Sequence, residues 1–97
     1  MKILALEHEL PEATAEGFRK YAKDEARKVW ALVQAGVVRE SYFRADRSEA
    51  VLVLECPSVE EAREALSTLP FVYNKLITFE LIPLKAYHGF ERLFEKE

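Results

Sequence analysis

The stretch AVLVLECPSVEEAREALSTLP, residues 50–70, predicts a strand followed directly by a helix. The run from Ala50 to Cys56 is apolar and rich in β-branched residues, which is typical of a strand. Ser58 and Glu61 have the spacing of a capping box, in which each side chain binds a free backbone N–H of the other residue at a helix start. Pro70 ends this helix, whose apolar residues recur at intervals of three or four: Val59, Ala62, Ala65, Leu66 and Leu69.

Two further patterns precede this stretch. Residues 37–44 are a second β-rich run, and the five residues between the two runs suit a hairpin loop, so the two strands should pair antiparallel. Residues 12–35 show the spacing of an amphipathic helix instead, and Gly36 ends it. Gly17 costs about 1 kcal/mol inside a helix, so we expect the first turn to fray or the helix to start later, at Thr14.

Two more strands complete the pattern. Residues 2–8 form a short apolar run, and residues 76–84 form the last strand after a loop over residues 71–75. Pro83 places the end of the last strand at a sheet edge or beyond the paired region. The order strand, helix, strand, strand, helix, strand predicts an α+β fold, the ferredoxin-like βαββαβ arrangement, with a four-stranded antiparallel sheet and both helices on one face.

Both faces of this sheet are apolar. In the strand at residues 50–56, Leu52 and Leu54 point to one face and Val51 and Val53 to the other. An antiparallel sheet with one wet face should alternate between apolar and polar residues, so we expect a second copy to cover the open face. The chain is therefore predicted to form a homodimer, a dimeric α+β barrel whose two sheets enclose a shared interior.

Residues 1–97 fit a single ferredoxin-like domain with a short C-terminal helical arm at about residues 86–97. A chain of 97 residues with 49% hydrophobic content buries one core. That length leaves no room for a deep cavity of its own, so we expect any small-molecule pocket to be shared between subunits. The apolar residues of the arm are spaced as in an amphipathic helix: Tyr87, Phe90, Leu93 and Phe94.

Charge and composition narrow the possible functions. The chain has 14 Lys and Arg against 17 Asp and Glu, with no block of either sign, so neither nucleic acid nor a membrane is an expected partner. The single Cys56 cannot form an internal disulfide, which favours a cytoplasmic location. His8 and His88 lie far apart in the chain, and no glycine-rich phosphate loop is present, so we expect neither a metal nor another cofactor.

Glu25 is the charged residue whose position most needs an explanation. On a helical projection it falls in the middle of the apolar stripe that contains Phe18, Val29 and Val33. Its carboxylate should therefore be partly buried, with a pKa raised by desolvation. Such a carboxylate suits proton abstraction next to a carbonyl at neutral pH. The alternative is a structural role, in which Glu25 pairs with an arginine of the sheet or reaches solvent at a bent helix end.

Arg39 is the second candidate, as a substrate-binding residue. If its strand alternates regularly, Arg39 shares a face with Ser41 and opposes Val38, Glu40 and Tyr42. One of these two sets lines the space between the sheets of the dimer. An arginine there could bind a substrate carboxylate through two hydrogen bonds, or it could be the structural partner of the buried glutamate.

Two residues complete the candidate site. His8, at the end of the first strand, shares a face with Leu4 and Leu6 and is a second possible acid or base. Tyr42 offers a hydroxyl group for substrate binding. For both residues the alternative is an exposed or hydrogen-bonded position at the sheet edge without a role in chemistry.

The chain resembles muconolactone isomerase and its relatives over about residues 2–85. The resemblance lies in the acidic pair Asp24-Glu25 with Gly36 and Arg39 after it, and in the segments CPSVE at 56–60 and LSTLPF at 66–71. It implies a dimeric α+β barrel that assembles into larger rings and isomerises an unsaturated lactone bearing a carboxylate, without a cofactor. By this resemblance Glu25 is the base that moves a proton between two carbons through an enolate-like intermediate, and Arg39 anchors the carboxylate.

The leading hypothesis is therefore a muconolactone isomerase-like protein that binds a small lactone or carbonyl compound and transfers a proton with Glu25. An alternative enzyme class is a cofactor-independent monooxygenase with the same dimeric barrel, which would depend on His8 or Tyr42. The third hypothesis is a ligand-binding or structural oligomer without catalytic activity. A cavity next to Glu25 would favour the first hypothesis over the third.

Overall fold

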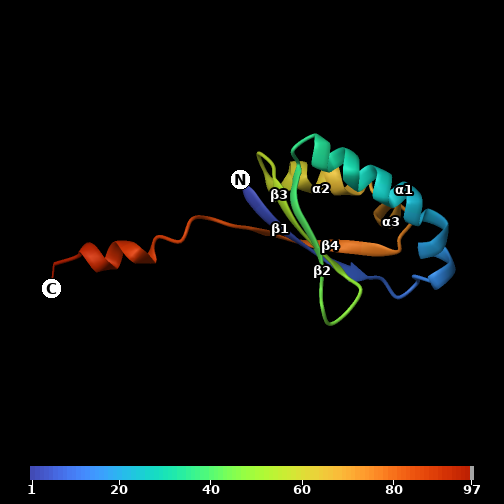
Figure 1. Cartoon of the computed structure of the whole chain (residues 1–97), viewed down its shortest axis with the longest axis horizontal. Helices are drawn as coiled ribbons and strands as arrows, with labels where there is room; N and C mark the ends of the chain where they lie inside the picture. Colours follow the sequence, from blue (N-terminus) through green and yellow to red (C-terminus); the bar gives the residue numbers. More distant parts are fainter. Residues whose placement is uncertain (97) are drawn as a thin grey trace.

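The computed structural model describes residues 1–96 and shows four strands, three α-helices and one 3-10 helix (Figure 1). In chain order the elements are β1 (Lys2–Glu9), α1 (Ala15–Gln34), β2 (Val38–Phe43), β3 (Ala50–Glu55), α2 (Val59–Ser67), α3 (Pro70–Tyr73), β4 (Ile77–Pro83) and η1 (Gly89–Phe94).

The strands form one antiparallel sheet in the order β2-β3-β1-β4. The three α-helices lie together on one face of this sheet (Figure 1). The ferredoxin-like prediction is therefore confirmed, and β4 lies at an edge, as Pro83 indicated. Within residues 1–96, no helix combines the length and the apolar character needed to cross a membrane.

The start of α1 follows from its cap. The hydroxyl of Thr14 accepts a hydrogen bond from the backbone N–H of Gly17 at 3.0 Å, which confirms the later of the two expected starts. A Cβ at Gly17 would lie 3.0 Å from Leu76 and 3.2 Å from the Thr14 hydroxyl, so a glycine allows this close approach. At the other end Gly36 has a φ of 78°, a left-handed conformation that ends the helix at little cost.

The segment after α2 differs from the sequence prediction. Ser58 caps α2 by accepting a hydrogen bond from the N–H of Glu61 at 3.1 Å, as expected. The loop predicted at residues 71–75 is wrong, because Pro70–Tyr73 form the short helix α3. Pro70 occupies the first position of this helix, where the missing N–H of proline leaves no hydrogen bond unmade.

A β-bulge changes the direction of side chains in β2. Val38 pairs with Leu54, but the next pair in register is Glu40 with Val53, so Arg39 is the extra residue. Cross-strand partners share a face of the sheet. The prediction that Val38, Glu40 and Tyr42 point the same way was therefore wrong, because Val38 faces the helices and the other two face the opposite side.

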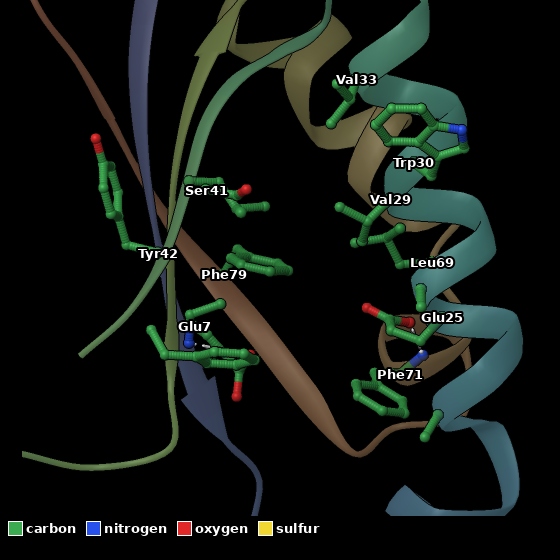
Figure 2. A pocket seen from close by; sticks show the side chains of 15 residues that line it. Glu7, Glu25, Val29, Trp30, Val33, Ser41, Tyr42, Leu69, Phe71 and Phe79 are labelled. Atoms are coloured by element: carbon green, nitrogen blue, oxygen red, sulfur yellow. Dashed lines mark hydrogen bonds between the residues drawn. The ribbon is translucent and has the colours of Figure 1, made fainter. Parts of the chain in front are cut away.

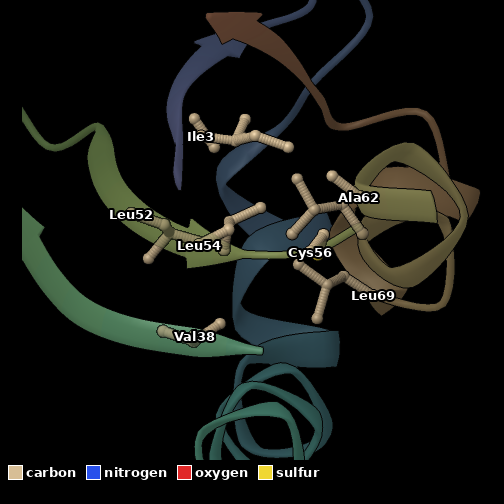
Figure 3. Close-up of a cluster of buried hydrophobic side chains, with 9 residues drawn as sticks. Ile3, Val38, Leu52, Leu54, Cys56, Ala62 and Leu69 are labelled. Carbon is tan, nitrogen blue, oxygen red and sulfur yellow. The ribbon is translucent and has the colours of Figure 1, made fainter. Parts of the chain in front are cut away.

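The core lies between the sheet and the helices (Figure 3). Ile3, Leu54 and Leu69 are completely buried there, and Ala62 of α2 packs against them. The opposite face of the sheet carries half-buried apolar side chains and, within the described residues, no helix covers it (Figure 1). These side chains are Leu4, Leu6, Val51, Val53 and Ile82, which we call the open face.

The C-terminal residues leave the sheet as an extended segment that ends in η1 (Figure 1). Its apolar side chains are exposed: 73% for Tyr87, 66% for Phe90, 77% for Leu93 and 85% for Phe94. The arm expected at about residues 86–97 thus contains a 3-10 helix, and residue 97 lies outside the described residues.

We expect Thr14→Ala to lower the free energy of unfolding by about 1 kcal/mol, because it removes the cap of the helix that carries Glu25. Thr14→Ser is the matched control, since it keeps the hydroxyl and should unfold like the wild type. Urea titration followed by circular dichroism measures both variants. Equal stability of the alanine and serine variants would contradict the role of this cap.

Candidate functional site

A cavity of ≈ 590 Å³ lies between α1 and the sheet, within a single chain (Figure 2). The expectation that the chain has no room for a cavity of its own was wrong, because α1 and the sheet leave this space between them. Trp30 and Phe43 are 60% and 77% exposed and mark its mouth. The interior is lined mainly by apolar residues: Val29, Val33, Leu52, Leu69, Phe71 and Phe79.

Glu25 projects from α1 into this cavity (Figure 2). The carboxylate is half-buried, and its Oε1 accepts a hydrogen bond from the backbone N–H of Phe71 at 2.9 Å. Burial raises the pKa of Glu25 above its ordinary value, and the hydrogen bond from Phe71 opposes part of that rise. The helical projection thus placed this carboxylate correctly among apolar neighbours, but its partner is a backbone N–H and not an arginine.

The backbone N–H of Phe71 is available to Glu25 because it has no hydrogen-bond partner within its own helix, α3. The first N–H groups of a helix have no carbonyl partner within the helix, and Phe71 follows Pro70 in the first turn of α3. The ring of Phe71 also packs edge-on against Phe18 of α1, with 5.1 Å between ring centroids. Two contacts therefore hold the start of α3 against α1 and orient Glu25.

Glu7 is a second carboxylate in the cavity, and the sequence analysis missed it. Glu7 enters from β1, opposite Glu25 (Figure 2), and its Oε1 accepts a hydrogen bond from the N–H of Ala50 at 3.3 Å. Burial is the largest cause that raises the pKa of Glu7, the hydrogen bond from Ala50 opposes part of that rise, and the negative charges of Glu49, Glu25 and Glu9 add to it. Glu7 follows the buried residues Ile3 and Ala5 at intervals of two, so the alternation of β1 predicts that it points to the same face.

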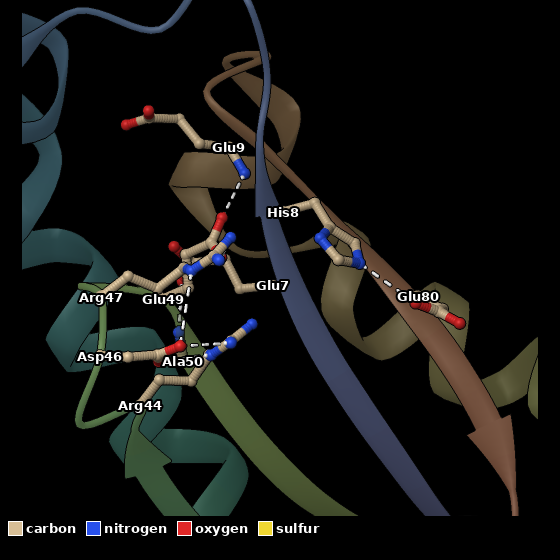
Figure 4. Close-up of polar contacts among 9 residues, drawn as sticks. All are labelled: Glu7, His8, Glu9, Arg44, Asp46, Arg47, Glu49, Ala50 and Glu80. Atoms are coloured by element: carbon tan, nitrogen blue, oxygen red, sulfur yellow. Dashed lines mark hydrogen bonds and ion pairs between the residues drawn. The ribbon is translucent and has the colours of Figure 1, made fainter.

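Around Glu7, the hairpin between β2 and β3 adds a third carboxylate (Figure 4). Glu49 accepts a hydrogen bond from the backbone N–H of Glu9 at 3.1 Å, which ties the hairpin to the end of β1. Nη1 of Arg47 lies 3.5 Å from Oε1 of Glu49, and Nη2 of Arg44 lies 2.7 Å from Oδ2 of Asp46. The arginines of the hairpin thus pair with hairpin carboxylates, and neither lines the cavity.

Arg39 and Tyr42 were predicted to bind substrate, and the structure places both side chains away from the cavity. The Nε of Arg39, the bulge residue, donates a hydrogen bond to the carbonyl of Gly36 at 2.6 Å. Tyr42 borders the cavity, but its ring points away from it (Figure 2). Its hydroxyl donates a hydrogen bond to Glu40 at 2.6 Å, and this bond raises the pKa of Tyr42.

His8 lies on the opposite face of the sheet from Glu7 and is exposed. Its Nε2 is 3.1 Å from Oε1 of Glu80 on β4, in an ion pair or hydrogen bond at the surface (Figure 4). The structure therefore does not bring His8 and Glu25 together. Across residues 1–96, no three His, Cys, Asp or Glu side chains come together in a way that could hold a metal ion.

Comparison with known proteins shows which architecture this is. No family model matches the chain, and no curated protein sequence matches it significantly. A solved structure of muconolactone isomerase superimposes with a TM-score of 0.74, at 21% sequence identity, over 92% of this chain and 93% of that chain. The chain has the fold of muconolactone isomerase.

A second solved structure supports the same assignment of fold. It is 5-chloro-2-hydroxyhydroquinone dehydrochlorinase from Burkholderia phenoliruptrix AC1100, in complex with 2,5-dihydroxybenzoquinone. The TM-score is 0.62 at 14% identity, over 88% of this chain and 94% of that chain. The muconolactone isomerase-like, ferredoxin-like α+β fold is thus common to proteins whose names describe different reactions, so the fold alone does not specify the chemistry of this cavity.

The raised pKa of Glu25 predicts a pH-dependent gain in stability for Glu25→Gln. A carboxyl whose pKa is higher in the folded state costs stability as the pH rises from its unfolded to its folded pKa, and the cost stays constant above that range. The amide still accepts the hydrogen bond from Phe71 but carries no charge. We expect a higher melting temperature than the wild type at pH 8 and a smaller difference near pH 4.

Glu12→Gln is the matched control, because Glu12 is exposed in the turn before α1. Its melting temperature should follow that of the wild type at both pH values. A Glu25→Gln variant that is less stable than the wild type at pH 8 would contradict the burial of this charge.

Proposed function

We propose that this chain is a cofactor-free proton-transfer isomerase of a small lactone or carbonyl compound, bound in the cavity beneath α1. The observation that carries the proposal is Glu25, a half-buried carboxylate that one backbone N–H orients toward an apolar cavity. The fold shared with muconolactone isomerase is consistent with this function.

Glu25 is the proposed base. A carboxylate in an apolar environment has a raised pKa and is a better base at neutral pH than one in water. Removing a proton from the carbon next to a carbonyl leaves an enolate, and returning a proton to another carbon completes the isomerisation. The apolar walls of the cavity hold a small ring close to the carboxylate and limit the access of water.

The proposal gives no role in proton transfer to Arg39, Tyr42 or His8. Their side chains bind Gly36, Glu40 and Glu80, respectively, and point away from the cavity or lie on the other face of the sheet. An oxygenase that depends on His8 or Tyr42 has less support for the same reason. For the isomerase and for the oxygenase alike, we propose that a small molecule binds in this cavity.

We also propose that the chain forms a homo-oligomer through the open face. Leu4, Leu6, Val51, Val53 and Ile82 form an apolar surface that no helix among residues 1–96 covers. The exposed aromatic residues of the C-terminal arm also have few partners in their own chain and support contacts with a second copy. A cytoplasmic location, supported by the single free Cys56, is part of the same proposal.

Two lactones test the role of Glu25. α-Angelica lactone is an uncharged five-membered lactone with its double bond between the β and γ carbons, and its carboxymethyl analogue carries a negatively charged carboxymethyl group in place of the methyl group. We expect the wild-type protein to exchange the α protons of at least one lactone with D₂O, measured by NMR above the buffer rate. Glu25→Gln should lower this rate about 100-fold or more.

Glu12→Gln serves as the control carboxylate outside the cavity and should exchange like the wild type. Wild-type exchange of neither lactone above buffer, or full activity of the Glu25→Gln protein, would rule out the proposed function.

Sedimentation velocity tests the oligomer. We expect the wild type to sediment as a dimer or larger assembly at micromolar concentration and Val53→Arg to sediment as a monomer, because a charge at the centre of the open face cannot be buried there. Ser48→Arg in the exposed hairpin adds the same charge elsewhere and should leave the assembly intact. A monomeric wild type would refute the proposal.

A further inference from the structure

Two carboxylates face the cavity from opposite walls. Glu25 comes from α1 and Glu7 from β1, so the two side chains line the cavity from the helix and from the sheet (Figure 2). Each is half-buried and each accepts one backbone N–H, from Phe71 and Ala50, respectively. The proposed function uses only one of the two. Glu7, the other carboxylate, has the position of a second proton-transfer group on the opposite side of a bound substrate ring.

The cavity has acidic side chains but no basic one among its described lining residues. Its lining among the described residues contains two glutamates and no lysine, arginine or histidine. The neighbouring arginines bind elsewhere: Arg39 to the Gly36 carbonyl, Arg44 to Asp46 and Arg47 to Glu49. A substrate carboxylate would therefore enter an apolar space next to carboxylate groups and without a cation to pair with.

The two carboxylates differ in the charges around them. Burial raises the pKa of both, and one backbone N–H lowers the pKa of each, that of Ala50 at Glu7 and that of Phe71 at Glu25. Glu7 also faces Glu25 on α1, Glu49 of the hairpin and Glu9 on its own strand, and these negative charges raise its pKa further. The charges around Glu7 thus favour its protonated form, and an ionised Glu25 opposite a protonated Glu7 is a matched base and acid.

We propose that Glu7 is a second catalytic carboxylate, the acid opposite Glu25, and that the cavity takes an uncharged unsaturated cyclic carbonyl compound. This inference rests on the proposed function, since it assumes proton transfer by Glu25. It separates this chain from an enzyme for a lactone that bears a carboxylate, because the described lining of the site has no positively charged group to pair with the anion.

The proposed step balances within the site. Glu25 removes a proton from the α carbon of a β,γ-unsaturated lactone, and the electron pair of that C–H bond forms an enolate that extends over the adjacent double bond. The hydroxyl of protonated Glu7 then gives its proton to the γ carbon, where the electron pair forms the new C–H bond. The double bond now lies between the α and β carbons. Glu25 then releases its proton to water and Glu7 takes one up from water, which restores the starting state.

The same two lactones, with variants at both carboxylates, test this inference. For the wild type we expect isomerisation of α-angelica lactone, and kcat/KM for the carboxymethyl analogue lower by about 100-fold. Glu25→Gln should lose both α-proton exchange and isomerisation. Glu7→Gln should keep the exchange, which needs only the base, and lose isomerisation by about 100-fold.

Glu7→Met provides a second variant of similar size without an acid, in case the amide alters folding, and melting curves check both proteins. Glu12→Gln is again the control carboxylate. A Glu7 variant that isomerises the lactone like this control would overturn the role of Glu7 while leaving Glu25 as the base.

Equal or better turnover of the carboxymethyl analogue by the wild type would overturn the uncharged substrate class. By contrast, the proposed function itself fails only when α-proton exchange is absent for both lactones or does not depend on Glu25. The three outcomes are therefore distinguishable in one set of measurements.

Discussion

The hydrogen bond from the backbone N–H of Phe71 to the carboxylate of Glu25 is the contact on which the site depends. A carboxylate among apolar side chains without a partner would be too costly to keep, and this bond supplies the partner from a helix start that needs an acceptor. Together with the packing of Phe18 on Phe71, it holds α1 at the start of α3. Farther along, α1 stands away from the sheet, and the cavity occupies that gap.

The fold leaves the chemistry of this cavity open. The chain shares its architecture with muconolactone isomerase and with a dehydrochlorinase, at identities too low to transfer a reaction. What distinguishes the cavity is its own lining, with Glu7 and Glu25 on opposite walls and Arg39 held outside by a β-bulge. Proton transfer on an uncharged ring fits that lining better than the binding of an anion.

Regular patterns in the sequence predicted part of this site and missed the rest for identifiable reasons. Helical spacing placed Glu25 correctly, because α1 is a regular helix throughout. Strand alternation failed at Arg39, because one extra residue in β2 reverses the direction of the side chains after Val38. Glu7 follows Ile3 and Ala5 on the same face of β1, so strand alternation indicates its burial, but its place in a cavity depends on α1, which covers that face.

Local signals in the sequence alone determined the order of the four strands and the two longer helices, the helix start at Thr14, the cap at Ser58, the ferredoxin-like topology and the apolar character of both sheet faces. These depend on neighbours within a few residues, which spacing and turn chemistry describe well. Only the tertiary structure decided the partner of Glu25, the approach of Glu7 from the other wall and the cavity between them. Each of these depends on how far α1 stands from the sheet, and that distance is set by packing between residues far apart in the chain.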